Sequence, residues 1–342
     1  MNPIFARGLV TAVVAPAALP GGVVAADPVA DFYAGKHVTI AVVAAGGAYG
    51  ANGQMLAEHM GRHIPGKPGM SIQVKSGAGG RTLMNWLYNV APQDGTALGF
   101  IHKDVAAFSQ LESKGAKYKA DGFQWIGSVA PMITVMFVRK DAGATGIEGL
   151  KTTEVTMGAS GKSHPTALFP RLLNQAMGAR LKVVTGYRGS SDIFLAVERG
   201  EVSGTTFTWD TVRAQKPDWI EKGEIVPLVQ LALEKDRSLP DTPLLADILP
   251  GAEDKAMARF LTSGSKVGRA FAAPPGVPAE RVAALRKAFD AVVKDEAYLA
   301  HAKRARMPVD PLSGEELQAL VTSVATAPKS VVARAKDAMG MK

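Results

Sequence analysis

The chain has 342 residues, of which 47% are hydrophobic and 20% charged, so it is long and apolar enough for about two folded domains and is not a disordered protein. Its net charge of +8 favours anionic partners, but the basic residues do not cluster as they do in nucleic-acid-binding proteins. Cysteine is absent, which excludes disulfides, zinc–thiolate sites, iron–sulfur clusters and thiol catalysis.

The first 26 residues have the features of a secretory signal peptide. Arg7 is the only charged residue before Asp27, and the segment from Gly8 to Ala26 is apolar and rich in small residues. It ends in Val24-Ala25-Ala26, a small-x-small pattern that fits signal peptidase. A transmembrane anchor is the alternative, but the prolines and glycines of this segment would interrupt a spanning helix. We expect cleavage here and a periplasmic mature protein.

Strands and helices alternate in the first third of the mature chain. Strands are predicted at 38–43, 72–74 and 97–101 from β-branched and alternating apolar residues. Helices are predicted between them, because apolar residues recur at helical spacing from Leu56 to Ile64 and from Leu83 to Val90. This order of elements is typical of a parallel α/β sheet.

The same pattern restarts in the middle of the chain. Strands are predicted at 155–157, 182–184 and 226–233. Pro165 suits the first turn of a helix, and Ser190 is expected to cap another. Near the C-terminus one helix begins at Pro278 and a capping box, Ser313-Gly314-Glu315-Glu316, begins a second. The sequence therefore predicts two α/β units.

Four loops rich in glycine or hydroxyl residues follow the predicted strands, at 44–50, 76–80, 158–163 and 185–190. Ligands of parallel sheets bind beyond the carboxyl ends of the strands, where helix N-termini attract anions. Glycine also lets the backbone approach a ligand closely. Because two loops belong to each unit, we expect an anion-binding cleft lined from both sides. The alternative is that these glycines only serve the turns.

The loop at 158–163 permits two further interpretations. Gly161-Lys162-Ser163 matches the end of a phosphate-binding loop, but Thr156 stands where the first glycine is required, which disfavours nucleotide hydrolysis. His164 next to Ser160 and Ser163 could serve a serine hydrolase as general base. No carboxylate that would orient this histidine lies near it in the sequence.

Metal and cofactor sites have little support. His59 and His63 lie one helical turn apart, close enough to share a metal ion, but no third ligand is apparent in the sequence. His63 would also be favourable simply as a partner of the helix C-terminus. No metal site is predicted, and no motif indicates a cofactor.

Several segments, in order along residues 31–325, resemble the substrate-binding receptors of tripartite tricarboxylate transporters, the Bug family of periplasmic solute-binding proteins. They are residues 31–40 with Gly46-Gly47-Ala48-Tyr49, Gly77-Ala78-Gly79-Gly80, Ala91-Pro92-Gln93-Asp94-Gly95-Thr96, Gly186-Tyr187-Arg188-Gly189, 198–202, Leu239-Pro240-Asp241-Thr242-Pro243 and 273–278.

The resemblance implies a type II periplasmic-binding-protein fold of the α/β class. Two lobes, each a mostly parallel sheet flanked by helices, would enclose a ligand cleft. We expect lobe 1 at 27–132 plus 242–342 and lobe 2 at 133–241. The resemblance further implies a monomer that captures a small organic anion, a carboxylate, and delivers it to a membrane permease. A ligand sensor for a membrane kinase is the alternative within the same class.

Carried over by position, the ligand-binding residues fall in all four loops. They are Ala45, Gly46, Gly47, Ala48 and Tyr49; Ser76, Gly77, Ala78 and Gly79; Ser160, Gly161 and Ser163; and Tyr187, Arg188 and Gly189. Arg188 could grip a carboxylate with two parallel N–H donors or could pair with Asp192. The chain departs from the family pattern at Gly50, where an aspartate is usual, and at Ser76, where a proline is common.

Overall fold

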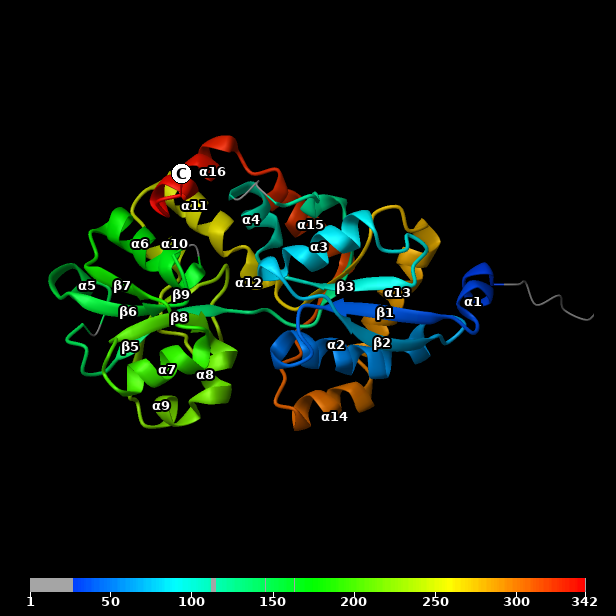
Figure 1. The fold of residues 1–342 in the computed structure, drawn as a ribbon, viewed down its shortest axis with the longest axis horizontal. Coiled ribbons are helices and arrows are strands. Elements are labelled where there is room, and N and C mark those ends of the chain that lie inside the picture. The colour runs from blue at the N-terminus through cyan, green and yellow to red at the C-terminus, as the bar shows by residue number, and fades with distance from the viewer. Residues whose placement is uncertain (1–26, 112–114, 145, 163, 342) are drawn as a thin grey trace, which may run out of the picture.

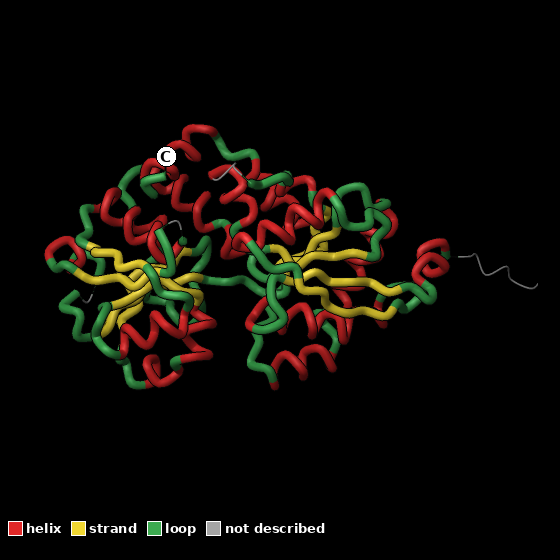
Figure 2. The backbone as a smooth tube through the Cα atoms, viewed as in Figure 1, coloured by secondary structure: helices red, strands yellow, loops and turns green. Residues whose placement is uncertain are grey.

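The computed structural model describes residues 27–111, 115–144, 146–162 and 164–341. Two β-sheets lie side by side, and each has helices on both faces (Figure 1). The tube view shows the same two blocks of strands between layers of helix (Figure 2). The predicted signal peptide and Ser163 lie outside the described residues. None of the described helices has the length and apolar composition needed to cross a membrane.

The first sheet has six strands in the order β11-β4-β10-β3-β1-β2. Their bounds are β1 His37–Val42, β2 Gly69–Val74, β3 Ala97–Ile101, β4 Gln124–Ser128, β10 Ala270–Ala273 and β11 Leu312–Ser313. β1 pairs in parallel with β2 and β3, while β10 is antiparallel to both β3 and β4, and β11 is antiparallel to β4. The three strands predicted in this part of the chain are therefore β1, β2 and β3.

The second sheet has five strands in the order β7-β6-β8-β5-β9. Their bounds are β5 Thr134–Arg139, β6 Val155–Ala159, β7 Leu181–Thr185, β8 Gly204–Thr208 and β9 Ile225–Leu231. β6 pairs in parallel with β7 and β8, while β5 is antiparallel to β8 and β9. The strands predicted at 155–157, 182–184 and 226–233 are β6, β7 and β9.

Both sheets are mixed, but most strands of each run in one direction, as the sequence predicts: β1, β2, β3 and β4 in the first sheet and β6, β7, β8 and β9 in the second. Parallel pairing is confined to the β-α-β units that the sequence pattern showed. In the first sheet the C-terminal part of the chain adds β10 between β3 and β4, running in the opposite direction. In the second sheet β5 enters directly from β4 and lies antiparallel between β8 and β9.

Helices cover the first sheet on both faces (Figure 1). They are α1 Pro28–Tyr33, α2 Gly47–Met60, α3 Arg81–Asn89, α4 Val105–Leu111, α12 Gly264–Val267, α13 Ala279–Val292, α14 Glu296–Arg304 and α15 Gly314–Ala325, with short 3₁₀ turns η1 Gly61–His63, η2 Ala78–Gly80 and η3 Ala120–Gly122. Leu56 of α2, Phe289 of α13 and Tyr298 of α14 belong with Ile40 of β1 to one buried hydrophobic cluster. The capping box of α15 is formed by Ser313 and Glu316, as the sequence predicts.

Helices also cover the second sheet. They are α5 Gly149–Thr152, α6 Pro165–Met177, α7 Ser190–Glu198, α8 Trp209–Gln215, α9 Pro217–Glu221, α10 Leu245–Ile248, α11 Ala252–Thr262 and α16 Lys329–Ala338. Residues of β5 alternate between the faces: Phe137 packs with α7 and α9, and Met136 packs in the opposite layer. The expected Ser190 cap is wrong, because Gly189 holds the cap position and the Ser190 Oγ accepts a hydrogen bond from the Gln215 Nε2 instead, at 3.0 Å.

The two sheets share one apolar layer. The chain crosses from β4 to β5 between residues 128 and 134, and the segment after β9 runs through α10 and α11 before it rejoins the first sheet at β10. The C-terminal helix α16 packs against α11 and α6 beside the second sheet and against α4 beside the first (Figure 1). Its buried residues Val332 and Ala335 belong to a hydrophobic cluster that includes Leu87 of α3 and Leu172 of α6.

Candidate functional site

A cavity of about 560 Å³ lies between the two sheets. The first sheet's side contributes the start of α2, η2, α3, the turn after β3 and the start of α4; the second sheet's side contributes the start of α6, the end of β8 and α8. The lining residues are Ala48, Tyr49, Ala78, Arg81, Met84, His102, Lys103, Asp104, Val105, Phe108, Ala116, Tyr118, Met132, Thr134, His164, Pro165, Thr166, Thr206, Phe207, Thr208 and Thr211. A volume of this size suits a small organic molecule.

Two helices begin at the wall of this cavity. α2 starts at Gly47, and its cap residue Gly46 has no side chain to satisfy the first N–H groups. α6 starts at Pro165 after His164. At α2 the unpaired N–H groups favour an anion, whereas at α6 proline has no N–H and the Thr166 N–H is already bonded to the His164 Nδ1. At both helices the positive end of the helix dipole favours an anion. The cavity therefore has a positive helix end on each side.

Tyr49 links the start of α2 to the turn after β3. Its ring stacks on the His102 ring with centroids 5.8 Å apart and an interplanar angle of 9°, and it packs against Phe100 at 4.8 Å. The Lys103 backbone N–H donates to the Tyr49 hydroxyl at 3.4 Å. Burial, reinforced by the negative charge of Asp104, raises the pKa of the Tyr49 hydroxyl well above its ordinary value. Tyr49 thus remains a neutral hydroxyl at the cavity wall.

His102 is held as a neutral donor. The Asp104 backbone N–H donates to the His102 Nδ1 at 3.3 Å, so the proton of the neutral ring is on Nε2. Burial lowers the pKa of His102 below its ordinary value; Asp104 opposes this shift and Lys103 adds to it. The Lys103 ammonium pairs with the Asp104 carboxylate at 3.0 Å. The turn after β3 therefore offers an N–H donor and a cation that is partly neutralised.

On the second sheet's side of the cavity, His164 has the same tautomer as His102, with its proton on Nε2. Its Nδ1 accepts from the Thr166 backbone N–H at 3.3 Å and lies 2.9 Å from the Thr166 hydroxyl oxygen. That oxygen accepts from the Ser160 backbone N–H at 3.1 Å, which leaves the hydroxyl hydrogen for His164. Burial, followed by the field of His102, lowers the pKa of His164. Thr166 thus stands where a catalytic triad would place a carboxylate.

Three of the predicted ligand residues line the cavity, namely Ala48, Tyr49 and Ala78. The other glycine-loop residues of the first sheet, Ala45, Gly46, Gly47, Ser76 and Gly77, are exposed beside it, and Gly79 belongs to η2. Ser160 and Gly161 are half-buried at the end of β6, next to the cavity residue His164. Ser163 cannot be placed, since it lies outside the described residues.

The fourth predicted loop does not line the cavity. Tyr187 is half-buried against the apolar cluster beneath α7, and Gly189 caps that helix. The Arg188 side chain is 92% exposed, and its Nε donates to Asp192 at 3.1 Å, as the alternative from the sequence had it. Its ligand role remains a prediction.

The strongest polar groups of the cavity wall were not among the residues predicted from the sequence. His102, Lys103 and Asp104 directly follow β3, so the rule that located the four loops applies to them too, although no glycine marks this turn. Thr206 and Thr208 reach the cavity from β8. β8 was not predicted, and its alternation of threonines carries no signal of a ligand site.

The departure at Gly50 has a local structural reason. A Cβ atom at this position would lie 1.9 Å from the Ala45 carbonyl oxygen and 2.6 Å from that of Ala44. The loop before α2 therefore folds tightly over the helix, and only glycine fits beneath it. An aspartate at position 50 would therefore require a different conformation of this loop.

No protein-family model matches the sequence, and no curated protein matches it. Solved structures do. A TctC solute-binding protein from Polaromonas has a TM-score of 0.67 and 17% identity, covering 89% of this chain and 98% of its own. An R. palustris protein with adipate has a TM-score of 0.62 and 20% identity, covering 89% of this chain and 97% of its own. MatC from Rhodopseudomonas palustris with bound malate has a TM-score of 0.61 and 19% identity, covering 89% of this chain and 99% of its own.

These similarities show the fold. The chain has the two-lobed, type II periplasmic-binding-protein architecture, so the fold class expected from the sequence is confirmed. Of these three structures, the Polaromonas protein is a solute-binding protein, and the other two hold adipate and malate, which are dicarboxylates.

Proposed function

We propose that this chain is a periplasmic solute-binding receptor of the tripartite tricarboxylate type, which binds a small organic anion between its lobes. One observation carries the proposal. The cavity between the sheets is bounded by the N-termini of α2 and α6 and by two neutral histidines, His102 and His164, whose Nε2–H groups are not used by the backbone. Such donors bind carboxylates without a catalytic step.

The cavity wall also suggests the shape of the ligand. Met84, Phe108, Met132 and Phe207 give the lining an apolar character, while the donor His102 stacks on Tyr49. A ligand with a carboxylate at one end and an aliphatic or aromatic body would match both parts. We infer an organic acid with a sizeable apolar skeleton, bound by its charged end at the α2 and α6 termini.

We further propose that lobe 1, residues 27–132 plus 242–342, and lobe 2, residues 133–241, close on this ligand, with α10, α11 and α16 of the segment 242–342 packed beside the sheet of lobe 2. The receptor would act as an exported monomer and pass the acid to a membrane permease. The leader-like first 26 residues support export, and the solute-binding proteins that share the fold support a carrier role.

The test is a binding screen with a chemical control. The purified chain is titrated calorimetrically with mono-, di- and tricarboxylates, and each acid is paired with its methyl ester. We expect at least one acid to bind with 1:1 stoichiometry and its ester to bind more weakly, because the ester lacks the charge that the helix ends attract. Binding of no acid, or equal binding of acid and ester, would contradict the proposal. Scattering measurements on the bound form then test closure, which should reduce the radius of gyration.

A further inference from the structure

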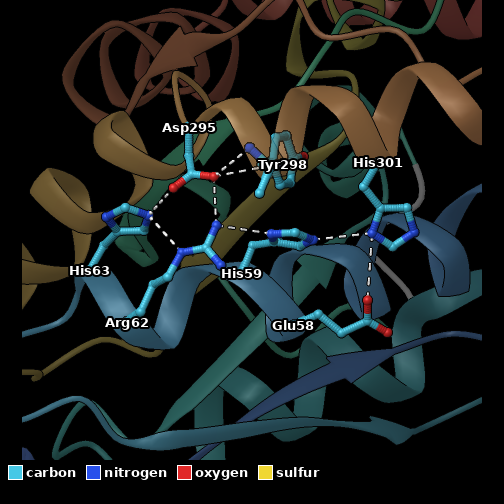
Figure 3. Close-up of polar contacts among 8 residues, drawn as sticks. Glu58, His59, Arg62, His63, Asp295, Tyr298 and His301 are labelled. Carbon is cyan, nitrogen blue, oxygen red and sulfur yellow. Dashed lines mark hydrogen bonds and ion pairs between the residues drawn. The ribbon is translucent and has the colours of Figure 1, made fainter.

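Glu58 and His59 of α2 meet His301 of α14 where these two helices pack together beside the first sheet (Figure 3). The His59 Nε2 lies 3.1 Å from the His301 Nδ1, and the Glu58 Oε2 lies 3.5 Å from the same nitrogen. All three potential ligand atoms fall within 4.8 Å of one another. His59 and His301 are 242 positions apart in the chain, so the sequence could not show the third ligand.

The hydrogen bonds around this cluster provide one N–H group for the three potential ligand atoms, His59 Nε2, His301 Nδ1 and Glu58 Oε2. The Arg62 Nη2 lies 3.1 Å from the His59 Nδ1, and because a guanidinium only donates, this nitrogen accepts. The one proton of the neutral His59 ring is then on Nε2 and points at His301. The His301 Nδ1 accepts this N–H group, so it brings no proton of its own toward the Glu58 carboxylate oxygen 3.5 Å away. Two acceptor atoms therefore face each other beside a single N–H group, an arrangement that a cation would relieve.

The spacing matches tetrahedral coordination. Zinc–nitrogen and zinc–oxygen bonds of about 2.0–2.2 Å place neighbouring ligand atoms about 3.3–3.5 Å apart at the corners of a tetrahedron. The two measured separations, 3.1 and 3.5 Å, bracket these values. The Glu58 side chain is 45% exposed, so it can move to close the third edge. Three protein ligands leave a fourth position open to water.

We propose that Glu58, His59 and His301 form a binding site for a divalent transition-metal ion, with Zn²⁺ as the best match to two imidazoles and one carboxylate. The ion replaces the shared proton and ties α14 to α2. This site is separate from the cavity between the sheets, and the proposal does not depend on the proposed carboxylate ligand.

Arg62 competes with the metal. When His59 binds an ion through Nε2, its proton must sit on Nδ1, which then faces the Arg62 guanidinium donor-to-donor. Arg62 retains a second partner, since its Nη2 lies 2.5 Å from the Asp295 carboxylate, and His63 contacts the same carboxylate at 3.1 Å. Arg62 is therefore a positioning residue that disfavours the metal-bound tautomer. A glutamine there could accept the Nδ1 proton with its side-chain oxygen.

The experiment uses the full chain without a histidine tag, stripped with a chelator and titrated with ZnCl₂ by calorimetry. We expect one ion per chain. His301→Gln should weaken binding more than about tenfold, and Arg62→Gln should strengthen it. His37→Gln is the matched control: it removes an exposed histidine at the start of β1, bonded to Ser71 and outside the proposed ligand set, and should leave the affinity unchanged. Cobalt(II) in place of zinc should give the intense visible absorption of a four-coordinate ion.

Opposite effects of His301→Gln and Arg62→Gln are the signature of the site, because a merely structural contact would be weakened by both. Should His301→Gln fail to fold, Glu58→Gln at the exposed ligand replaces it, with weaker binding expected. The proposal is overturned if the unsubstituted chain shows no saturable zinc binding. It is equally overturned if binding survives His301→Gln or Glu58→Gln unchanged, or is lost in His37→Gln.

Discussion

Arg269 and Asp210 form an ion pair that joins the two halves of the molecule. Arg269 directly precedes β10 of the first sheet, and Asp210 lies in the first turn of α8 beside the second. The Arg269 side chain is only 3% exposed, and its Nη1 also donates to the Pro131 carbonyl in the crossing segment, at 2.6 Å. This pair therefore fixes the chain where it passes between the sheets.

Removal of the buried cation should be costly. Arg269→Met leaves the Asp210 carboxylate without its main partner, and we expect a loss of about 3 kcal/mol in the free energy of unfolding. Arg213 pairs with the same carboxylate but is 43% exposed, so Arg213→Met should cost less than about 1 kcal/mol. Urea unfolding followed by tryptophan fluorescence measures both. Equal losses would show that burial of Arg269 adds nothing.

The Arg269–Asp210 pair also predicts that the stability of the fold depends on pH in the acidic range. Burial alone would raise the pKa of Asp210, but Arg269 and Arg213 outweigh it and hold this pKa below its ordinary value. The ionised carboxylate therefore stabilises the fold fully above the unfolded pKa of about 3.9, and this contribution is lost as the pH falls through the lower native pKa. The stability gap between the unsubstituted chain and Asp210→Asn should shrink as the pH drops from about 5 towards 3. A gap independent of pH would refute this account.

Ligand binding should strengthen as the pH falls. The pKa values of His102 and His164 are lowered in the ligand-free protein, so both rings are neutral at pH 7. A bound carboxylate favours the protonated rings and raises these pKa values, so binding takes up protons. Between pH 8 and 6 we expect the affinity to rise by up to about tenfold per pH unit for each histidine protonated. In His164→Gln the calorimetric affinity should vary less with pH; an unaltered profile would exclude His164.

The loop before α2 offers a steric test with a close control. In Gly50→Ala the new methyl group meets the Ala45 carbonyl oxygen, so the loop must shift, at a cost of roughly 1–3 kcal/mol. The acid identified in the screen should then bind more weakly, while circular dichroism shows the fold retained. Gly46→Ala has open space around the added atom and should change affinity little. Similar affinities for the two variants would remove this loop from the ligand site.

Local features of the fold could be predicted from the sequence. β3 has the predicted bounds, 97–101, and the capping box begins α15 at the expected residue, because both depend on residues within one short segment. β10 was not predicted. Its four residues, Ala270–Ala273, gain their place only by pairing with β3 and β4, which lie far away in the chain. Mixed pairing is thus a tertiary property that alternation and run length do not encode.

In the candidate site, too, local features could be predicted from the sequence and features that depend on tertiary contacts could not. The glycine loops could be located because glycine and small residues mark strand ends, and Ala48, Tyr49 and Ala78 do line the cavity. His102 was missed because a single histidine after a strand has no pattern of its own. His164 was noticed only as a hydrolase base, whereas its bond to Thr166 gives it a donor role. Which ring nitrogen carries a proton follows from hydrogen bonds that form only on folding.

The apolar layer shared by both sheets makes folding depend on the order in which the chain is synthesised. α16, which closes this layer against α4, α6 and α11, is made after all three of them, and β10 enters the first sheet between β3 and β4 long after both of these strands have been made. A nascent chain therefore lacks a central strand and a closing helix until these later segments have emerged. Such a chain stays open to chaperones, and a product truncated before α16 exposes the surface beneath Val332 and Ala335 to proteases.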